Sequence, residues 1–387
     1  MNHFDVTYHP SPTLTRSLLV LIGAGVLAWA LGLVFAPERA WASLMLVSFW
    51  LVSMGLAGSL FVGLQYACGA GWAVAFRRVP EAMVAALPVG AAGLILVFLI
   101  HPDLYPWMAQ HGESTGFQAL WLQRSFFLLR AIVYFALWLG FSAYLVRNSR
   151  RQDEDGSLSH TRRNIGASLA YMFVFALTYW LASVDWIMSL EPEWTSTIFG
   201  IYNFSGMFVA GLAAIILLVL WLKRSAPLCD FVNDEHLHDL GKLLFAFSTF
   251  WMYIFFSQYM LIWYANMTEE SVYYILRQQG VLGVLFIVNV VLNWGVPFLI
   301  LLSSAAKRTP AVLASMAVLI LIGRWLDLYL MILPPVTHGR AAFPWIETGM
   351  MLGAMGLFGV AFLAWFRRAP QTPVRDPMLA QSLGYHN

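Results

Sequence analysis

Apolar residues in this chain occur in ten long runs separated by short polar segments. A bilayer core of about 30 Å is crossed by a helix of roughly 20 mainly apolar residues. Because backbone polar groups in a bilayer must be satisfied internally, such runs form helices. We therefore predict an all-α integral membrane protein with ten transmembrane helices, in which residues 1–387 form a single polytopic membrane domain. The predicted spans are residues 15–36, 41–66, 82–100, 125–146, 165–189, 197–222, 240–266, 280–303, 311–333 and 345–366.

The basic residues orient these spans. Lys and Arg are enriched on the cytoplasmic side of membrane helices, and most of the 22 basic residues here lie on the side that holds the N-terminus. We expect both termini to be cytoplasmic, together with the highly charged loops 147–163 and 223–239. Residues 367–387 are expected to form a disordered cytoplasmic tail. The basic residues that fall in the opposite loops are Arg39, Arg124, Arg277 and Arg340.

Composition removes several classes of protein. The chain is 60% apolar and 11% charged, with a net charge of +2, whereas about a quarter of the residues of soluble domains are charged. This excludes a soluble enzyme and a nucleic-acid-binding protein. Cys68 and Cys229 form no C-x-x-C motif, which excludes covalent c-type haem and thiolate-ligated iron–sulfur clusters in this chain. All nine histidines lie in loops or at span ends, so we expect neither a bis-histidine haem nor a metal site.

Four charged residues fall inside the predicted spans. Asp185 lies near the outer end of span five, and Arg130 lies about a turn and a half below the outer end of span four. Arg324 and Asp327 are three residues apart on span nine and therefore share one face. Charges in a bilayer are costly and need partners, so we expect these four to neutralise one another. They form either a site for a quinol head group or a proton exit path, or a buried ion-pair network that fixes helix packing.

Span seven carries polar residues at steps of four or seven, which place them roughly on one helix face. Titratable groups lie at the cytoplasmic mouth of this face, where histidine is readily tuned for proton transfer near neutral pH. The face is either a proton relay from the cytoplasm or a set of interhelical hydrogen bonds. The residues of this candidate proton path are His236, His238, Asp239, Lys242, Thr249, Tyr253 and Ser257, and Asp185, Arg130, Arg324 and Asp327 complete it on the outer side.

Two further features are noted at the outer surface and in span eight. The outer turn 101–107 contains two prolines and two aromatic residues and suits either a docking surface or a membrane-surface cap. Asn289 and Asn293 are expected to face protein, and Pro297 is expected to kink span eight. A quinol bound at the outer side would meet a rim formed by His101, Asp103, Arg130 and Asp185.

Several segments spread over nearly the whole chain carry distinctive sequence. They are 183–200 (SVDWIMSLEPEWTSTIFG), 238–247 (HDLGKLLFAF), 256–266 (FSQYMLIWYAN), 323–329 (GRWLDLY) and 101–107 (HPDLYPW). Together they resemble the F-type membrane subunit of bacterial alternative complex III, in the NrfD-like, polysulfide-reductase membrane-subunit superfamily. The positions matched to the family's motifs are Asp185, His238, Asp239, Lys242, Arg324 and Asp327.

The resemblance implies a fold, a location and a set of partners. The fold would be two four-helix bundles, residues 41–190 and 197–333, with one flanking helix at each end. The complex is a quinol:cytochrome c, or oxidase-linked, oxidoreductase of the bacterial inner membrane. A related ten-helix subunit holds the quinol, haem c and iron–sulfur clusters reside on periplasmic partner subunits, and small membrane subunits complete the assembly, which a terminal oxidase can join. Menaquinone or menaquinol is then expected at or near this chain.

Three functions stay open from the sequence. The first is a subunit of this complex in respiratory electron transport, without redox centres of its own and with a proton path. The second is a subunit that itself binds and oxidises quinol, although residues 334–340 (PPVTHGR) depart from the His-Arg-Asp-like run of the superfamily. The third is a secondary transporter, and against it the sequence shows no paired Gly/Pro-broken spans in matching halves.

Overall fold

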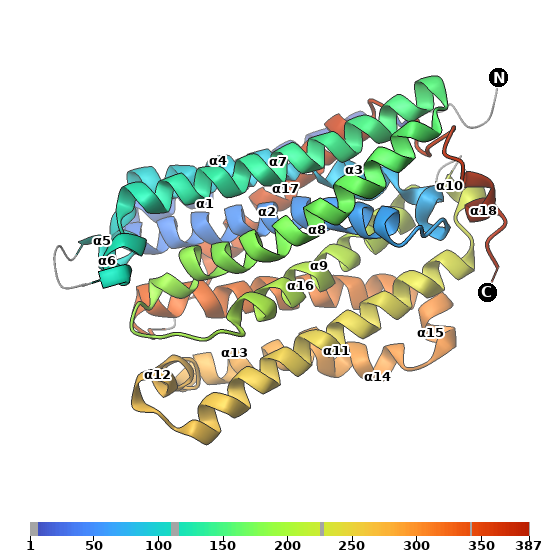
Figure 1. The fold of residues 1–387 in the computed structure, drawn as a ribbon. Helices are drawn as coiled ribbons and strands as arrows, with labels where there is room; N and C mark the ends of the chain where they lie inside the picture. The colour runs from blue at the N-terminus through green and yellow to red at the C-terminus, as the bar shows by residue number, and fades with distance from the viewer. Residues whose placement is uncertain (1–6, 110–115, 225–227, 341–342, 387) are drawn as a thin grey trace.

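The computed structural model describes residues 7–109, 116–224, 228–340 and 343–386 (Figure 1). These residues are helical throughout their regular structure, and they contain ten helical segments long and apolar enough to cross a membrane. This confirms the prediction of an all-α, multi-pass membrane protein with ten spans. The membrane-length segments are α1 (Pro12–Phe35), α2 (Pro37–Ala67), α3 (Arg78–Met83) with α4 (Ala86–Ile100), α7 (Arg124–Asp155), α8 (Leu158–Trp186), α9 (Phe199–Leu222), α11 (Asp234–Ala265), α13 (Gly280–Val290) with η4 (Val291–Gly295) and α14 (Val296–Leu301), α16 (Pro310–Thr337) and α17 (Trp345–Phe366).

Short helices occupy the connections between these segments. Those on the side where α2 begins cap the ends of the spans that meet there, and those on the other side lie near the chain's C-terminal end (Figure 1). The short elements are η1 (Trp72–Phe76), η2 (Pro102–Leu104), α5 (Pro106–Ala109), α6 (Gly116–Trp121), η3 (Met188–Leu190), α10 (Leu228–Phe231), α12 (Thr268–Arg277), α15 (Ser304–Arg308) and α18 (Leu379–Leu383).

Helix α2 is the centre of the molecule. Every residue in its apolar window is buried, and it packs against α4, α8, α9, α16 and α17. Lipid tails are as apolar as leucine, so helices in a bilayer gain stability by close packing at small residues. Gly58 shows this directly, because a Cβ there would lie only 2.4 Å from the carbonyl oxygen of Pro80 in α3. The small residues of span two therefore let its neighbours approach the backbone.

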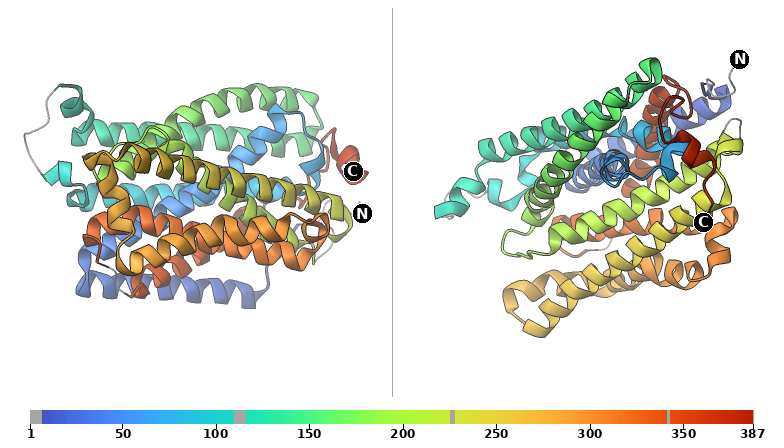
Figure 2. Two further views of the ribbon diagram at one scale, coloured as in Figure 1. Left: turned by 90° about the horizontal axis from the view of Figure 1, so that it is seen from below. Right: turned by 45° about the vertical axis from the view of Figure 1, so that its right-hand side comes forward.

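The first and last spans pack against each other. Figure 2 shows α1 and α17 side by side at one edge of the molecule. Their backbones meet at two glycines, where a Cβ on Gly25 would lie 2.5 Å from the Cα of Gly353. The remaining spans pack in two sets: α7 and α8 contact each other and α2, whereas α9 contacts α11 and α16. Helices α2 and α8 also contact α9, which joins the two sets.

Two expectations about the polar segments were wrong. The segment 147–163 is not a loop, because α7 continues to Asp155 and α8 begins at Leu158, and only Gly156, with φ of +69°, and Ser157 separate them. The apolar run ended where the helix left the predicted bilayer, although charged helix-forming residues continued the helix. The described part of the tail, residues 367–386, is ordered and contains α18, and its Thr372 side chain is fully buried.

Span eight is interrupted near Pro297, where the sequence predicts a kink. Proline has no backbone N–H, so it leaves the carbonyl four residues earlier without its helical donor. That carbonyl belongs to Asn293, and it accepts a hydrogen bond of 2.6 Å from Ser248 Oγ of α11. The helix also widens into the π-helical turn η4 directly before Pro297. The neighbouring helix α11 thus supplies the hydrogen bond that the proline removes, as the absence of water in a bilayer requires.

Candidate functional site: two buried ion pairs joined across the helices

The first ion pair lies at the outer ends of α7 and α8. Asp185 is the penultimate residue of α8, and Arg130 approaches it from α7 with Nε and Nη2 at 2.8 and 2.9 Å from the two carboxylate oxygens. Tyr134 and Trp121 donate to the same carboxylate at 3.0 and 2.9 Å. We call these four residues the Asp185 cluster. Its carboxylate accepts four hydrogen bonds, which matches the lone-pair capacity of an ionised carboxylate.

The guanidinium of the Asp185 cluster is equally well surrounded. Arg130 Nη1 donates to the carbonyl oxygen of Trp121 at 2.9 Å. Its guanidinium carbon also lies 4.1 Å from the ring centre of Trp121 and 4.6 Å from that of Phe126. Stacking of this kind stabilises a weakly hydrated guanidinium where water is scarce. Both charges are therefore fully compensated inside the protein.

The second ion pair lies on α16. Arg324 Nη1 donates to Asp327 Oδ2 at 2.7 Å, and neither side chain is exposed. The same carboxylate accepts Trp251 Nε1 of α11 at 3.3 Å, Asn289 Nδ2 of α13 at 3.1 Å, and the hydroxyl of Tyr202 of α9. We call the set of Arg324, Asp327, Tyr202, Asn203, Trp251 and Asn289 the Asp327 cluster.

A glycine makes room for the arginine of this cluster. A Cβ on Gly206 of α9 would lie 2.4 Å from Arg324 Nη1, so only glycine lets the guanidinium lie against that helix. Asn203, one turn earlier on α9, accepts Arg324 Nη2 at 2.5 Å through its Oδ1. The face of α9 toward α16 is thus shaped around one buried cation.

The Asp327 cluster reaches α8, the helix that carries Asp185. Asn203 Nδ2 donates to Ser183 Oγ at 3.0 Å, and Ser183 lies two residues before Asp185 on α8. The four buried charges neutralise one another in two separate pairs, Arg130 with Asp185 and Arg324 with Asp327. The hydroxyl of Ser183 itself donates to the carbonyl of Tyr179 in α8.

The second asparagine of span eight, Asn293, extends the Asp327 cluster by one residue. Asn293 Nδ2 donates to Asn289 Oδ1 at 2.7 Å, and Asn289 in turn donates to Asp327. Both are buried, which confirms that they face protein. Their polarity serves the carboxylate of Asp327 as well as packing.

The candidate proton path on α11 is not assembled as one internal chain. Thr249 donates to the carbonyl of Phe245 in its own helix at 3.0 Å, and Tyr253 is 64% exposed on the outer surface of the molecule. Ser257 is half-buried. The spacing placed these hydroxyls on one face correctly, but that face points largely away from the two clusters. A helical step fixes which residues share a face and leaves open what the face contacts.

The members of that path at the start of α11 contact the C-terminal tail. His236 forms a capping box with Asn233 at the start of α11, and Ser382 lies 3.4 Å from its Nε2. Tyr385 donates to Asp239 Oδ2 at 2.5 Å, and this hydrogen bond raises the pKa of Tyr385 to about 12. Asp239 also pairs with Lys242, and His238 lies near Glu235 and Ser304. The tail therefore covers the start of α11.

The proposed quinol rim separates into two parts. His101 stacks on Trp41 with ring centres 5.5 Å apart, and its Nε2 lies 3.2 Å from Glu38. Asp103 is exposed on η2. Among the described residues, no hydrogen bond or ion pair joins either side chain to the Asp185 cluster.

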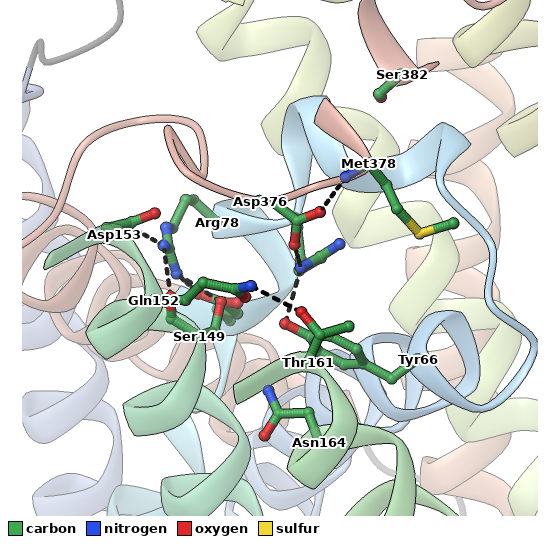
Figure 3. A network of polar contacts seen from close by, with 12 residues as sticks. Tyr66, Arg78, Ser149, Gln152, Asp153, Thr161, Asn164, Asp376, Met378 and Ser382 are labelled. Atoms are coloured by element: carbon green, nitrogen blue, oxygen red, sulfur yellow. Dashed lines mark hydrogen bonds and ion pairs between the residues drawn. The ribbon is translucent and has the colours of Figure 1, made fainter. Parts of the chain in front are cut away.

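Sequence reasoning missed two buried arginine sites. Arg277, assigned to an outer loop, is 1% exposed, pairs with Glu191 at 2.6 Å and donates to the carbonyl of Leu330 at 2.7 Å. On the other side, Arg78 pairs with Glu81, and Figure 3 shows its contacts with Asp153 and Ser149. The acid three residues after Arg78 was the available signal for this second site.

The same inner network reaches the C-terminal tail. Arg77 Nη1 lies 2.5 Å from Asp376 Oδ2 and 2.8 Å from the hydroxyl of Tyr66, and Figure 3 shows Asp376 and Tyr66 beside the Arg78 contacts. Asp376 and Tyr66 together raise the pKa of Arg77 despite its burial, so the arginine stays charged.

No protein-family model matches this sequence, and no curated protein matches it.

Proposed function

We propose that this chain is a membrane subunit of a bacterial quinol:cytochrome c oxidoreductase of the alternative complex III type, with the redox centres on its partners. One observation carries the proposal: two of the segments that resemble the F-type subunit meet in one hydrogen-bonded network. Ser183 comes from segment 183–200, Arg324 and Asp327 come from segment 323–329, and Asn203 joins them. Trp251, which donates to Asp327, lies between the two matching stretches of span seven. Polar and charged residues in separate spans are explained if those spans share one buried site.

The proposal includes the arrangement of the subunit and its surroundings. Residues 41–190 and 197–333 would form the two four-helix bundles of the superfamily, with α1 and α17 as the flanking helices. Both termini would lie in the cytoplasm of a bacterium, in its inner membrane. The partners would be the related quinol-holding subunit, the iron–sulfur and cytochrome c subunits, and a terminal oxidase where one is attached.

Quinol oxidation by this chain is the weaker proposal. A quinol hydroxyl at Asp185 would have to displace Tyr134 or Trp121, because the carboxylate already accepts four hydrogen bonds. The same saturation favours a packing role for this pair over a proton acceptor. A contribution to proton transfer would then run through water or rearranged side chains near Asp327, where Gln258 Oε1 is buried without a partner in the described structure.

Purification of the chain from its native membrane tests the subunit proposal. The membrane is extracted in a mild detergent, and an affinity tag on this chain captures whatever is bound. We expect multihaem c-type and iron–sulfur subunits to co-purify in fixed stoichiometry, visible by haem absorbance and mass spectrometry. Recovery of the chain alone, under conditions in which other respiratory complexes stay intact, would exclude the proposal.

Substitution of Asp185 separates the roles within the complex. Asp185→Asn is compared with Glu269→Gln, a matched carboxylate-to-amide change at an exposed position of α12. Quinol oxidation and proton release are measured separately in the purified complex, along with its assembly. We expect reduced assembly and an unchanged ratio of protons to electrons in the assembled fraction. A fully assembled complex that fails to oxidise quinol would instead place the quinol at this carboxylate.

A further inference from the structure

A small cavity lies between the Asp327 cluster and α12. Residues of α9, α11, α12, α13 and α16 line it, and α12 packs against α11, α13 and α16 at one end of the molecule (Figure 1). Counted as the space that the centre of a water molecule can reach, its volume is about 10 Å³. A buried cavity needs roughly 10 to 15 Å³ to hold one water, whereas organic ligands occupy several hundred Å³. The size therefore suits a single water molecule.

One residue that lines this cavity has a buried polar atom without a partner. Gln258 of α11 is 2% exposed, and its Nε2 donates to the hydroxyl of Tyr274 of α12 at 3.1 Å. Its Oε1 is buried, and no described residue donates a hydrogen bond to it. A buried amide oxygen without a hydrogen bond is costly, and native structures satisfy most such atoms, in part with ordered water. Gln258 therefore calls for a hydrogen-bond donor beside it.

A second residue that lines the cavity has a hydrogen atom left to donate. Asn289 of α13 donates to Asp327 Oδ1 at 3.1 Å through Nδ2, which is its one printed bond as a donor among the described side chains. A side-chain amide nitrogen carries two hydrogens, so one remains. The Oδ1 atom of Asn289 already accepts from Asn293 at 2.7 Å. A water here would accept from Asn289 and donate to Gln258, which meets the requirement of two to four polar partners.

The charges around the cavity favour a neutral occupant. Asp327 pairs with Arg324, and its carboxylate accepts four hydrogen bonds, so it has no lone pair to give a metal ion. Arg277 of α12 also lines the cavity, is 1% exposed and would repel a cation. An anion would instead meet the carboxylate of Asp327. Water is the small molecule that fits both the size and the charges.

We propose that this cavity binds one ordered water, which donates to Gln258 Oε1 and accepts from Asn289 Nδ2. The water completes a hydrogen-bonded line from Asp327 through Asn289 and Gln258 to Tyr274. It ties α12, which is not one of the membrane-length segments, to the ion pair on α16. Tyr274 also lines a larger pocket of about 360 Å³ at the end of α11, which gives the water a route of exchange. The site belongs to this chain and does not rest on the respiratory function proposed above.

Radiolytic footprinting of the purified full chain in detergent tests the water. X-rays convert a bound water into hydroxyl radicals, which oxidise the side chains beside it even where bulk solvent does not reach. Met331 lines the cavity and is 2% exposed, whereas Met83 is fully buried against Gly58 and does not line it. Mass spectrometry gives the oxidation rate of each methionine. Gln258→Leu removes the acceptor, and Gln123→Leu, at an exposed glutamine directly before α7, is the matched control.

We expect Met331 to be oxidised faster than Met83 in the native protein and in Gln123→Leu. In Gln258→Leu, shown to be folded by gel filtration, the rate at Met331 should fall to that of Met83. Equal rates for the two methionines in the native protein would overturn the site, and this comparison decides even if Gln258→Leu fails to fold. Fast oxidation of Met331 that persists in folded Gln258→Leu would overturn the assignment of the water to Gln258.

A density map of the native protein that resolves ordered waters gives a second, direct measurement. We expect one peak within hydrogen-bond distance of both Gln258 Oε1 and Asn289 Nδ2. A map that shows ordered waters elsewhere and no peak at this position would overturn the proposal.

Discussion

The Asp185 and Asp327 clusters hold similar charges in different ways. In the Asp185 cluster the ion pair itself joins two helices, because Arg130 is on α7 and Asp185 is on α8. In the Asp327 cluster both charges are on α16, and neutral donors from α9, α11 and α13 supply the contacts between helices. The first is therefore a charged clamp on one helix hairpin. The second is a self-neutralised centre around which four spans are organised.

Removing the carboxylate of the second cluster should have the largest effect. Asp327→Asn leaves Arg324, which has no exposed surface, without a counter-charge. Breaking a buried ion pair costs about 3 to 5 kcal/mol, so we expect a large loss of folded protein and of thermal stability in detergent. The double variant Asp327→Asn with Arg324→Gln should recover part of this loss, because it removes the stranded cation. Equal stability of Asp327→Asn and the native chain would contradict this account.

The same change in the first cluster should be milder. In Asp185→Asn, Arg130 keeps its hydrogen bond to the Trp121 carbonyl and its contacts with two aromatic rings. The free energy of unfolding should fall by about 2 to 3 kcal/mol, because hydrogen bonds to a charged group are lost while the remaining cation is still partly stabilised. Thermal unfolding beside Asp327→Asn gives the ranking, with Glu269→Gln as the exposed control. If Asp185→Asn proved the more damaging of the two, the clamp on α7 and α8 would be the organising centre instead.

Most of this contrast could not be predicted from the sequence alone. The lengths of the apolar runs predicted ten spans, because a bilayer imposes its thickness on each helix separately. The intramembrane charges were also found, since they are rare on an apolar background. Their pairing was not, because Arg130 and Asp185 are 55 residues apart and the partner is chosen by tertiary packing. Arg277 and Arg78 were missed for a related reason: each lies at the end of an apolar run, where a basic residue is normally exposed.

The tail and the α7–α8 connection show a second limit. Hydropathy reports where a helix leaves the bilayer, and the helix itself can continue through charged residues such as those before Asp155. The tail is short and polar in sequence, yet Asp376 and Ser382 are buried by contacts to segments about three hundred residues earlier. Order of this kind comes from specific partners, and composition carries no record of them.

Removing Asn203, which extends the Asp327 cluster to α8, tests whether the two clusters act together. Asn203→Ala removes the acceptor of Arg324 Nη2 and the donor to Ser183. A buried donor left without its acceptor costs about 1 to 3 kcal/mol, and thermal unfolding measures this loss. If the network is coupled, the loss of stability in the double variant, Asn203→Ala with Asp185→Asn, should differ from the sum of the two single losses by more than about 0.5 kcal/mol. Strict additivity would mean that the two clusters are independent.

The smallest effect is expected at a third carboxylate, Asp239, which accepts a hydrogen bond from Tyr385 of the tail. Its hydrogen bond from Tyr385 raises that phenol's pKa from 10.0 to about 12. Because the folded pKa is the higher one, this contact contributes fully below pH 10 and is lost as the pH rises through about 12. The difference in phenolate absorbance between the native chain and Tyr385→Phe reports the titration directly. Asp239→Asn should return the midpoint toward 10.0, and Tyr385→Phe should cost about 1 kcal/mol or less. A native midpoint already near 10.0 would show that the tail does not lie on Asp239, and the start of α11 would then be uncovered.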